Sequence, residues 1–183
     1  MTSDPGLLRL DCGVAVLRPW RRDDLASVRL HAHPAADATG PALAYPYPYS
    51  GGDGRAWLER AVAARGRAWA IDSDGQAIGG VSLEPDRADA GASCELGYWI
   101  GRRFHGRGLM GAVLAAFVPA ALRTPGMSRL TALVYPGNPA SCRVLEKTGF
   151  RREWSRRTAI VDCDGRSVVA SLYAIGTSGE HAA

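Results

Sequence analysis

The chain has 183 residues, of which 46% are hydrophobic and 22% are charged, and its formal net charge is +4. This length suits one domain with a substantial core, and the composition is ordinary for a folded protein. The longest nearly apolar run, residues 109–122, is shorter than the ~20 residues that a membrane-spanning helix needs. Since residues 1–6 also lack the pattern of a signal peptide, we expect a cytoplasmic protein with no membrane partner.

The first half of the chain predicts the order strand, helix, helix, strand, strand. Residues 14–19 are typical of a strand, and Asp23 and Asp24 suit the N-terminal end of the helix that follows. A second amphipathic helix around Trp57 ends near Gly66. Two strands, residues 69–72 and 77–83, are then joined by Asp74-Gly75, which is a strong hairpin signal.

The segment between the two helices, residues 34–54, is rich in proline, glycine and aromatic residues. Its Tyr45-Pro46-Tyr47-Pro48-Tyr49 run could wall a binding pocket. A surface connection with rigid turns explains the same composition equally well.

The second half predicts strand, helix, strand, helix and two further strands. An apolar helix runs from Gly108 to about Val118, and Pro119 is expected to kink or end it. The strand at residues 129–135 should return parallel to the strand at residues 94–100. The whole order indicates an α/β domain with a mixed sheet.

Cysteines, histidines and arginines give no further site. Cys12, Cys94, Cys142 and Cys163 form no C-x-x-C pair and the histidines have no ligand spacing, so we expect reduced cysteines and no metal. Arginine is spread along the chain, and its two clusters at residues 151–152 and 156–157 alternate along a strand. We interpret them as a solvated edge and expect no specific nucleic-acid partner.

A glycine-rich turn, residues 105–111, separates the strand at residues 94–100 from the apolar helix. Glycines allow backbone N–H groups to converge, and the helix N-terminus adds unpaired donors, so the turn suits a phosphate. Gly106, Gly108 and Gly111 also match the dinucleotide pattern G-x-G-x-x-G. That pattern needs an acidic residue ~20 positions later, and none occurs between Leu109 and Val144. We therefore disfavour a nicotinamide or flavin site, and no Gly-Lys-Ser/Thr follows to make a P-loop.

A second motif lies about 30 residues further on. Asn138 is a good helix N-cap, Pro139 suits the first helical position, and Gly149 suits the left-handed closing position. Alone, this is only a well-capped helix. Together with the glycine turn, the pattern becomes much more specific.

These motifs resemble the GCN5-related N-acetyltransferase (GNAT) superfamily, in the branch of ribosomal-protein N-terminal acetyltransferases similar to RimJ and RimL. The family's Q/R-x-x-G-x-G/A motif resembles residues 105–110, its E-x-G-Y-W strand resembles residues 95–99, and its N-x-x-S-x-x-V-x-E-K-x-G-F helix resembles residues 138–150. The resemblance covers about residues 12–176. It implies a mostly antiparallel seven-stranded sheet that is splayed at its centre, with about four helices on both faces.

The resemblance further implies acetyl-CoA as the co-substrate of a direct transfer to a primary amine. We expect residues 1–176 to form one such domain, residues 177–183 to be a flexible tail, and the protein to be a monomer or homodimer. The implied CoA-binding residues are Trp99, Ile100, His105, Gly106, Arg107, Gly108, Leu109, Met110, Gly111, Asn138 and Ser141.

Two departures from the family pattern affect the implied mechanism. His105 replaces the usual Gln or Arg, which should change little because the turn acts mainly through its backbone. Leu145 stands where many members carry the Tyr that protonates the leaving thiolate, so Ser141 is the candidate for that role. Glu95 is the candidate general base for the amine, although a plain solvent-facing carboxylate is an equal interpretation.

The acceptor is not specified by these motifs. A protein N-terminus is the preferred interpretation, with the Tyr45–Tyr49 segment as one wall of a peptide groove. A small amine such as an antibiotic or polyamine would instead favour acidic residues in the pocket. A noncatalytic module that binds CoA or associates with RNA is the alternative of another class.

Overall fold

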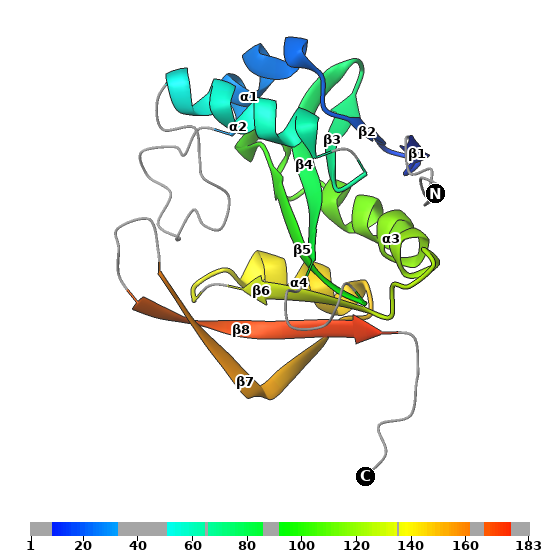
Figure 1. The fold of residues 1–183 in the computed structure, drawn as a ribbon, viewed down its shortest axis with the longest axis vertical. Helices are drawn as coiled ribbons and strands as arrows, with labels where there is room; N and C mark the ends of the chain where they lie inside the picture. The colour runs from blue at the N-terminus through cyan, green and yellow to red at the C-terminus, as the bar shows by residue number, and fades with distance from the viewer. Residues whose placement is uncertain are drawn as a thin grey trace.

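The computed structural model describes residues 9–32, 51–64, 66–85, 92–134, 136–161 and 167–176, which form one mixed sheet with helices on both faces (Figure 1). The sheet order is β1-β2-β3-β4-β5-β6-β8-β7. The strands are β1 Leu10–Asp11, β2 Val16–Pro19, β3 Ala68–Ser73, β4 Gln76–Pro85, β5 Ser93–Ile100, β6 Arg129–Val134, β7 Arg151–Val161 and β8 Ser167–Gly176. The helices are α1 Leu25–His31, α2 Gly51–Ala63, α3 Leu109–Leu122 and α4 Pro139–Lys147, with short 3-10 turns η1 Arg22–Asp24 and η2 Arg102–Phe104.

This order confirms the predicted α/β class and the predicted hairpin between β3 and β4. The one strand not anticipated is the two-residue β1, which raises the number of strands from seven to eight. The predicted Tyr45–Tyr49 wall, Cys163 and the tail at residues 177–183 lie outside the described residues. Within the described part of the chain, no helix is long and apolar enough to cross a membrane.

The sheet opens between β5 and β6. All other neighbouring strands are antiparallel, whereas β5 and β6 are parallel and joined by α3, as the sequence predicts. Their pairing runs from Ser93–Arg129 to Glu95–Thr131 and continues no further among the described residues. In Figure 1, β4 and β5 run down the view while β6 and β8 cross it, so the strands diverge beyond Glu95.

Two apolar clusters fill the two faces of the sheet. The larger one surrounds α3, whose Val113, Leu114 and Phe117 are completely buried. The smaller one, on the face covered by α1 and α2, contains Trp20 and Trp57. Pro119, predicted to kink or end α3, does not end it, because the helix continues to Leu122. Pro119 and Ala115 both face solvent, so water can bind the carbonyl that the proline leaves unpaired.

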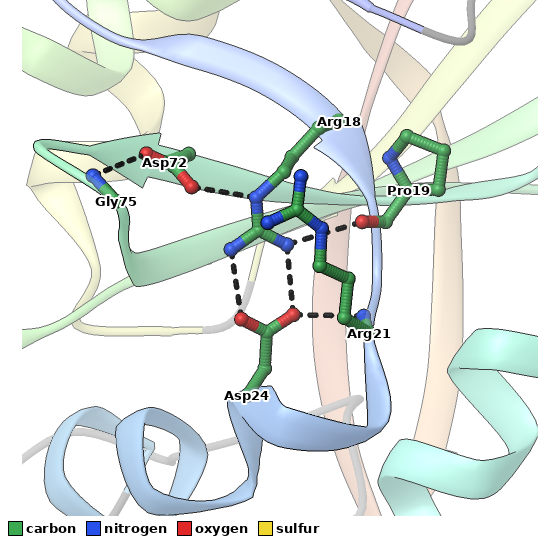
Figure 2. A network of polar contacts seen from close by, with 6 residues as sticks. All are labelled: Arg18, Pro19, Arg21, Asp24, Asp72 and Gly75. Atoms are coloured by element: carbon green, nitrogen blue, oxygen red, sulfur yellow. Dashed lines mark hydrogen bonds and ion pairs between the residues drawn. The ribbon is translucent and has the colours of Figure 1, made fainter.

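A buried ion network fixes the first helix to the sheet (Figure 2). Arg18 is 3% exposed and donates two hydrogen bonds to the carboxylate of Asp24, at 2.8 and 2.7 Å. It also donates to Asp72 on β3, whose other oxygen accepts the N–H of Gly75 in the hairpin turn. Asp24 lies at the N-terminal end of α1, as predicted, and it also joins η1 to β2 through Arg18.

Candidate active site

The glycine turn has the backbone geometry that the anion-site prediction requires. Gly106 and Gly108 have φ angles of 73° and 75°, in the left-handed region that glycine adopts most readily. Gly108 directly precedes α3, and its carbonyl accepts the first helical bond from Ala112. The N–H groups of residues 109–111 therefore have no partner within the helix and can bind an anion.

The space above this turn is open. A Cβ built on Gly106, Gly108 or Gly111 would meet nothing within 4 Å. Met110 is buried in the larger cluster and Leu109 packs against it, so both contribute to the site through their main chains. The guanidinium of Arg107 lies 5.8 Å from the ring centroid of Phe104, on the surface beside the turn. The turn can therefore accept a phosphate without rearrangement.

His105 ties the turn to the end of β5. Its Nε2 lies 2.9 Å from the carbonyl oxygen of Ile100, and since a carbonyl only accepts, Nε2 must donate the hydrogen bond. The family's Gln at this position could donate to the same carbonyl. The departure at His105 thus preserves a link between the turn and the open edge of the sheet.

For acetyl-CoA, the co-substrate that the family resemblance implies, we expect His105→Ala to raise KM about fivefold while changing kcat little, because one hydrogen bond is worth ~1 kcal/mol. Initial rates over a range of acetyl-CoA concentrations measure this change. His105→Gln is the matched control and should stay within twofold of the unmodified protein, because it keeps a donor. Equal KM values for the Ala and Gln variants would show that the link has no role.

Alternate residues of β5 direct their main-chain groups toward the open edge. Gly101 donates its N–H to Ile78 on the β4 side, at 2.8 Å. Because this orientation alternates along an antiparallel pair, Trp99 and Glu95 also face β4. The main-chain groups of Leu96, Tyr98 and Ile100 face the side where β6 has diverged.

The N-terminus of α4 lies close to β5, where the carbonyl of Ser141 is 3.5 Å from the Tyr98 hydroxyl. Asn138 caps the helix as predicted, and its Oδ1 accepts the N–H of Ser141 at 3.1 Å. The NH₂ group of the Asn138 side chain is exposed and can donate hydrogen bonds to a ligand. Gly149, at a φ of 92°, closes the helix in the predicted left-handed conformation. Leu145 is completely buried one turn after Ser141, and its aliphatic side chain offers no proton donor.

Tyr98 joins β5 to α4, a role that the sequence motifs do not reveal. Its hydroxyl donates to the carbonyl of Ser141 at 3.5 Å. Burial raises the pKa of the Tyr98 phenol to about 12. The group therefore stays protonated at neutral pH and acts as a donor beside Ser141.

Glu95 and Ser141 lie on opposite faces of the sheet. Tyr98 points to the α4 face, and Glu95, three positions away on the same strand, points to the face covered by α1 and α2. Glu95 pairs directly with Glu84 on β4. The two carboxylates are cross-strand neighbours, whose Cβ atoms lie about 5 Å apart in such pairs.

A pocket of about 160 Å³ lies on the same face as Glu95. Three tryptophan rings meet there: Trp20 stacks on Trp99 with centroids 6.2 Å apart, and Trp57 meets Trp20 edge-on at 5.0 Å. The pocket is lined by Trp20, Trp57, Arg60, Ala61, Ala64, Ala68, Gly80, Val81, Ser82, Glu84 and Trp99. Its floor on β4 and β5 is continuous with the Glu84–Glu95 pair.

Comparison with known proteins decides what this arrangement is. A family model described as "Acetyltransferase (GNAT) domain" matches residues 15–151. The chain belongs to the GNAT acetyltransferase family. The predicted resemblance is confirmed, and the glycine turn, the splayed edge and α4 occupy the matched region of this GNAT protein.

Relatives and solved structures agree with the GNAT assignment. A probable N-acetyltransferase of Bacillus subtilis, YjcK, is 36% identical over 81 residues, 44% of this chain and 45% of the relative. The matches therefore span about half the length of the curated relatives. A GNAT-family acetyltransferase structure from Bacillus anthracis has a TM-score of 0.76 at 17% identity, covering 92% of this chain and 98% of that one. Mycobacterium smegmatis RimJ has a TM-score of 0.67 at 26% identity, covering 92% and 85%.

The GNAT fold gathers the predicted residues into two groups. Residues 105–111, Ile100, Asn138 and Ser141 adjoin the open edge, while Glu95 and the side chain of Trp99 lie on the tryptophan face. Tyr98 lies in the E-x-G-Y-W motif and Trp57 in the predicted second helix, but neither was assigned to the site, and Glu84 and Trp20 were not singled out. Among the described residues, no group of three His, Cys, Asp or Glu side chains could hold a metal ion.

Proposed function

We propose that this protein transfers the acetyl group of acetyl-CoA to a primary amine, and that the preferred acceptor is the N-terminal amine of a protein. The observation that carries the proposal is the open glycine turn at the start of α3, directly beside the diverging edge of β5. A phosphate on the turn and an extended chain along the edge are what a CoA thioester would present. The Mycobacterium smegmatis RimJ structure holds a CoA disulfide, which supports the same ligand here.

In this proposal the CoA pyrophosphate binds the N–H groups of residues 106–111, with Arg107 near its charge. Pantetheine lies along β5 as an added strand and bonds to the main chain of Tyr98 and Ile100, because their groups face the opening. Trp99 is adjacent in sequence but turns its main chain toward β4. Asn138, whose oxygen caps α4, would use its NH₂ group to hold a pantetheine carbonyl.

The amine would approach from the face of Glu95, and the thiolate would leave toward Ser141. Glu95 takes a proton from the ammonium, directly or through water, so that the nitrogen lone pair can attack the thioester carbon. A main-chain N–H of β5 stabilises the oxyanion. The C–N bond forms and the C–S bond breaks, and the second proton lost by the nitrogen passes by way of water and the Ser141 hydroxyl to the departing sulfur, giving an amide and free CoA.

Release of CoA thiol from acetyl-CoA tests this function with N-terminal peptides, aminoglycosides and polyamines as acceptors. Stimulation by peptides alone supports the protein N-terminus, whereas stimulation by the small amines alone supports the alternative acceptor. If acetyl-CoA raises the melting temperature but no amine releases thiol, a noncatalytic CoA-binding module is the better interpretation. Stabilisation by NAD alone would contradict the CoA site itself.

We expect Glu95→Gln to lower kcat/KM by ~10²-fold or more at low pH, where free amine is scarce and a base is most needed. Ser141→Ala should lower kcat about fivefold, the worth of one hydrogen bond to the departing sulfur. The pH profiles of both variants measure these effects. Glu59→Gln removes an exposed carboxylate on α2 and is the control for charge alone. Wild-type profiles for either variant would remove that residue from the mechanism.

A further inference from the structure

The tryptophan pocket lies where the proposed acceptor would approach, and its lining has a definite chemistry. Ala61, Ala64, Ala68 and Gly80 keep its walls small, and the three indole rings make it apolar. Gly80 is required for this shape, because a Cβ there would lie 2.8 Å from the Trp20 ring and 3.0 Å from Trp99 Nε1. Charge is confined to Arg60 on α2 and Glu84 on β4.

We infer that this pocket selects acceptors whose amine is carried by a compact apolar group, and that Glu84 is a specificity-determining residue that holds the ammonium beside Glu95. The inference rests on the proposed function and deepens it, since it specifies the acceptor's chemistry. The occupant that we favour is the first residue of a peptide with an apolar side chain such as leucine or phenylalanine.

The strand register carries this inference. Gly80, Ser82 and Glu84 on β4 pair with Trp99, Gly97 and Glu95 on β5, and all six positions face α2. A ligand in the pocket therefore contacts Trp99 at one end of this patch and reaches the Glu84–Glu95 pair at the other. Gly97, between Trp99 and Glu95, presents no side chain to separate the pocket from the candidate base.

The charges fit the ammonium of either acceptor class, and Arg60 together with the apolar lining favours a peptide whose first residue is apolar. Two neighbouring carboxylates attract an ammonium, and an exposed Glu84 can hold it while Glu95 accepts its proton. Arg60, the other charged residue of the lining, can donate to the carbonyl of the same residue. An apolar side chain then fills the indole-lined space, where each additional methylene typically changes kcat/KM by 10-fold or more, up to ~200-fold.

The test compares three acceptors: a tetrapeptide that begins with leucine, the same peptide beginning with glycine, and isoamylamine, which carries the leucine side chain without a peptide. We expect kcat/KM at least ~10-fold higher for the leucine peptide than for the glycine peptide. Equal kcat/KM for isoamylamine and the leucine peptide would show that the pocket recognises the apolar amine alone, so that the acceptor is a small free amine. A slower rate for isoamylamine supports the peptide.

Two variants with matched controls locate the effect. Ala64→Phe fills the pocket and should remove most of the leucine preference through KM, with little change for the glycine peptide. Ala63→Phe places the same ring on the neighbouring exposed position outside the lining and should change nothing. Glu84→Gln should raise KM for all three amines several-fold, with Glu59→Gln as its charge control.

Quenching of tryptophan fluorescence by the peptides, with CoA present, gives a readout that does not need turnover. Preferential binding of the leucine peptide that Ala64→Phe removes would support the pocket even if no amine releases thiol, in which case the proposed function alone fails. Equal binding and equal rates for the leucine and glycine peptides would overturn the inference. Equal leucine-peptide preference in the Ala64→Phe and Ala63→Phe variants would also overturn the inference.

Discussion

Gly108→Ala is expected to raise the KM for acetyl-CoA more than tenfold and to lower the free energy of unfolding by about 1–2 kcal/mol. The stability loss arises because Gly108 has a φ of 75°, where an alanine Cβ approaches the following carbonyl. The larger effect on binding arises because the new methyl group occupies the open space above the turn, where the proposed phosphate would approach its N–H groups. Initial rates and denaturant unfolding measure the two effects separately.

Gly126→Ala is the matched control for backbone strain. Gly126 has a φ of 85°, and a Cβ at this position would also meet nothing within 4 Å, but the residue lies in the connection between α3 and β6. We expect a similar loss of stability and an unchanged KM for acetyl-CoA. If both variants raise the KM for acetyl-CoA equally, the weaker binding reflects general destabilisation, and the glycine turn is not the phosphate site.

Local features of this chain could be predicted because short-range chemistry fixes them. Asn138, Pro139 and Gly149 define both ends of α4 through caps that need only neighbouring residues. Asp74-Gly75 defines the hairpin in the same way, with both residues at positive φ. The turn at Gly106 and Gly108 was also predictable, since its geometry depends on backbone freedom and on the helix that follows.

Features that depend on strand register could not be predicted. That Glu84 faces Glu95 follows from the pairing of β4 with β5, and a shift of one residue would place Glu84 on the other face. Trp20 and Trp57 are 37 positions apart in the sequence and meet only because α2 packs on the sheet beside β2. That α3 does not end at Pro119 has a related reason, because packing of Ala121 into the core holds the last turn of α3 in place.

The ion network of Arg18 is another non-local feature, and it supports the tryptophan pocket. Arg18 connects β2 with η1 through Asp24 and with β3 through Asp72 (Figure 2). Trp20 follows Arg18 by two residues and lines the pocket. The hydrogen bond that Arg18 donates to Asp24 raises the pKa of the Arg18 guanidinium above its usual value. The guanidinium is therefore charged at every pH at which the protein folds.

We expect Arg18→Met to lower the free energy of unfolding by about 3–5 kcal/mol, because it leaves the buried Asp24 carboxylate without its cationic partner. Methionine preserves most of the volume of the arginine stem, so the loss reports the charge more than a cavity. Urea unfolding followed by circular dichroism measures it. Arg129→Met is the matched control: its pair with Glu153 is 28% and 27% exposed, and such a pair contributes only about 0–1 kcal/mol.

The double variant Arg18→Met with Asp24→Leu distinguishes two effects. One is the cost of leaving the Asp24 carboxylate buried without a cation, and the other is the loss of the Arg18–Asp24 interaction itself. Replacing both charges with apolar groups removes the uncompensated carboxylate, so we expect it to recover part of the stability lost in Arg18→Met. Recovery would be incomplete, because Asp72 still lacks the guanidinium and the N–H of Arg21 loses its bond to Asp24 at 2.8 Å. If the double variant is less stable than Arg18→Met, the network contributes mainly through its hydrogen bonds. In either case the acceptor KM should rise while the KM for acetyl-CoA stays constant, because Trp20 is displaced and the glycine turn is not.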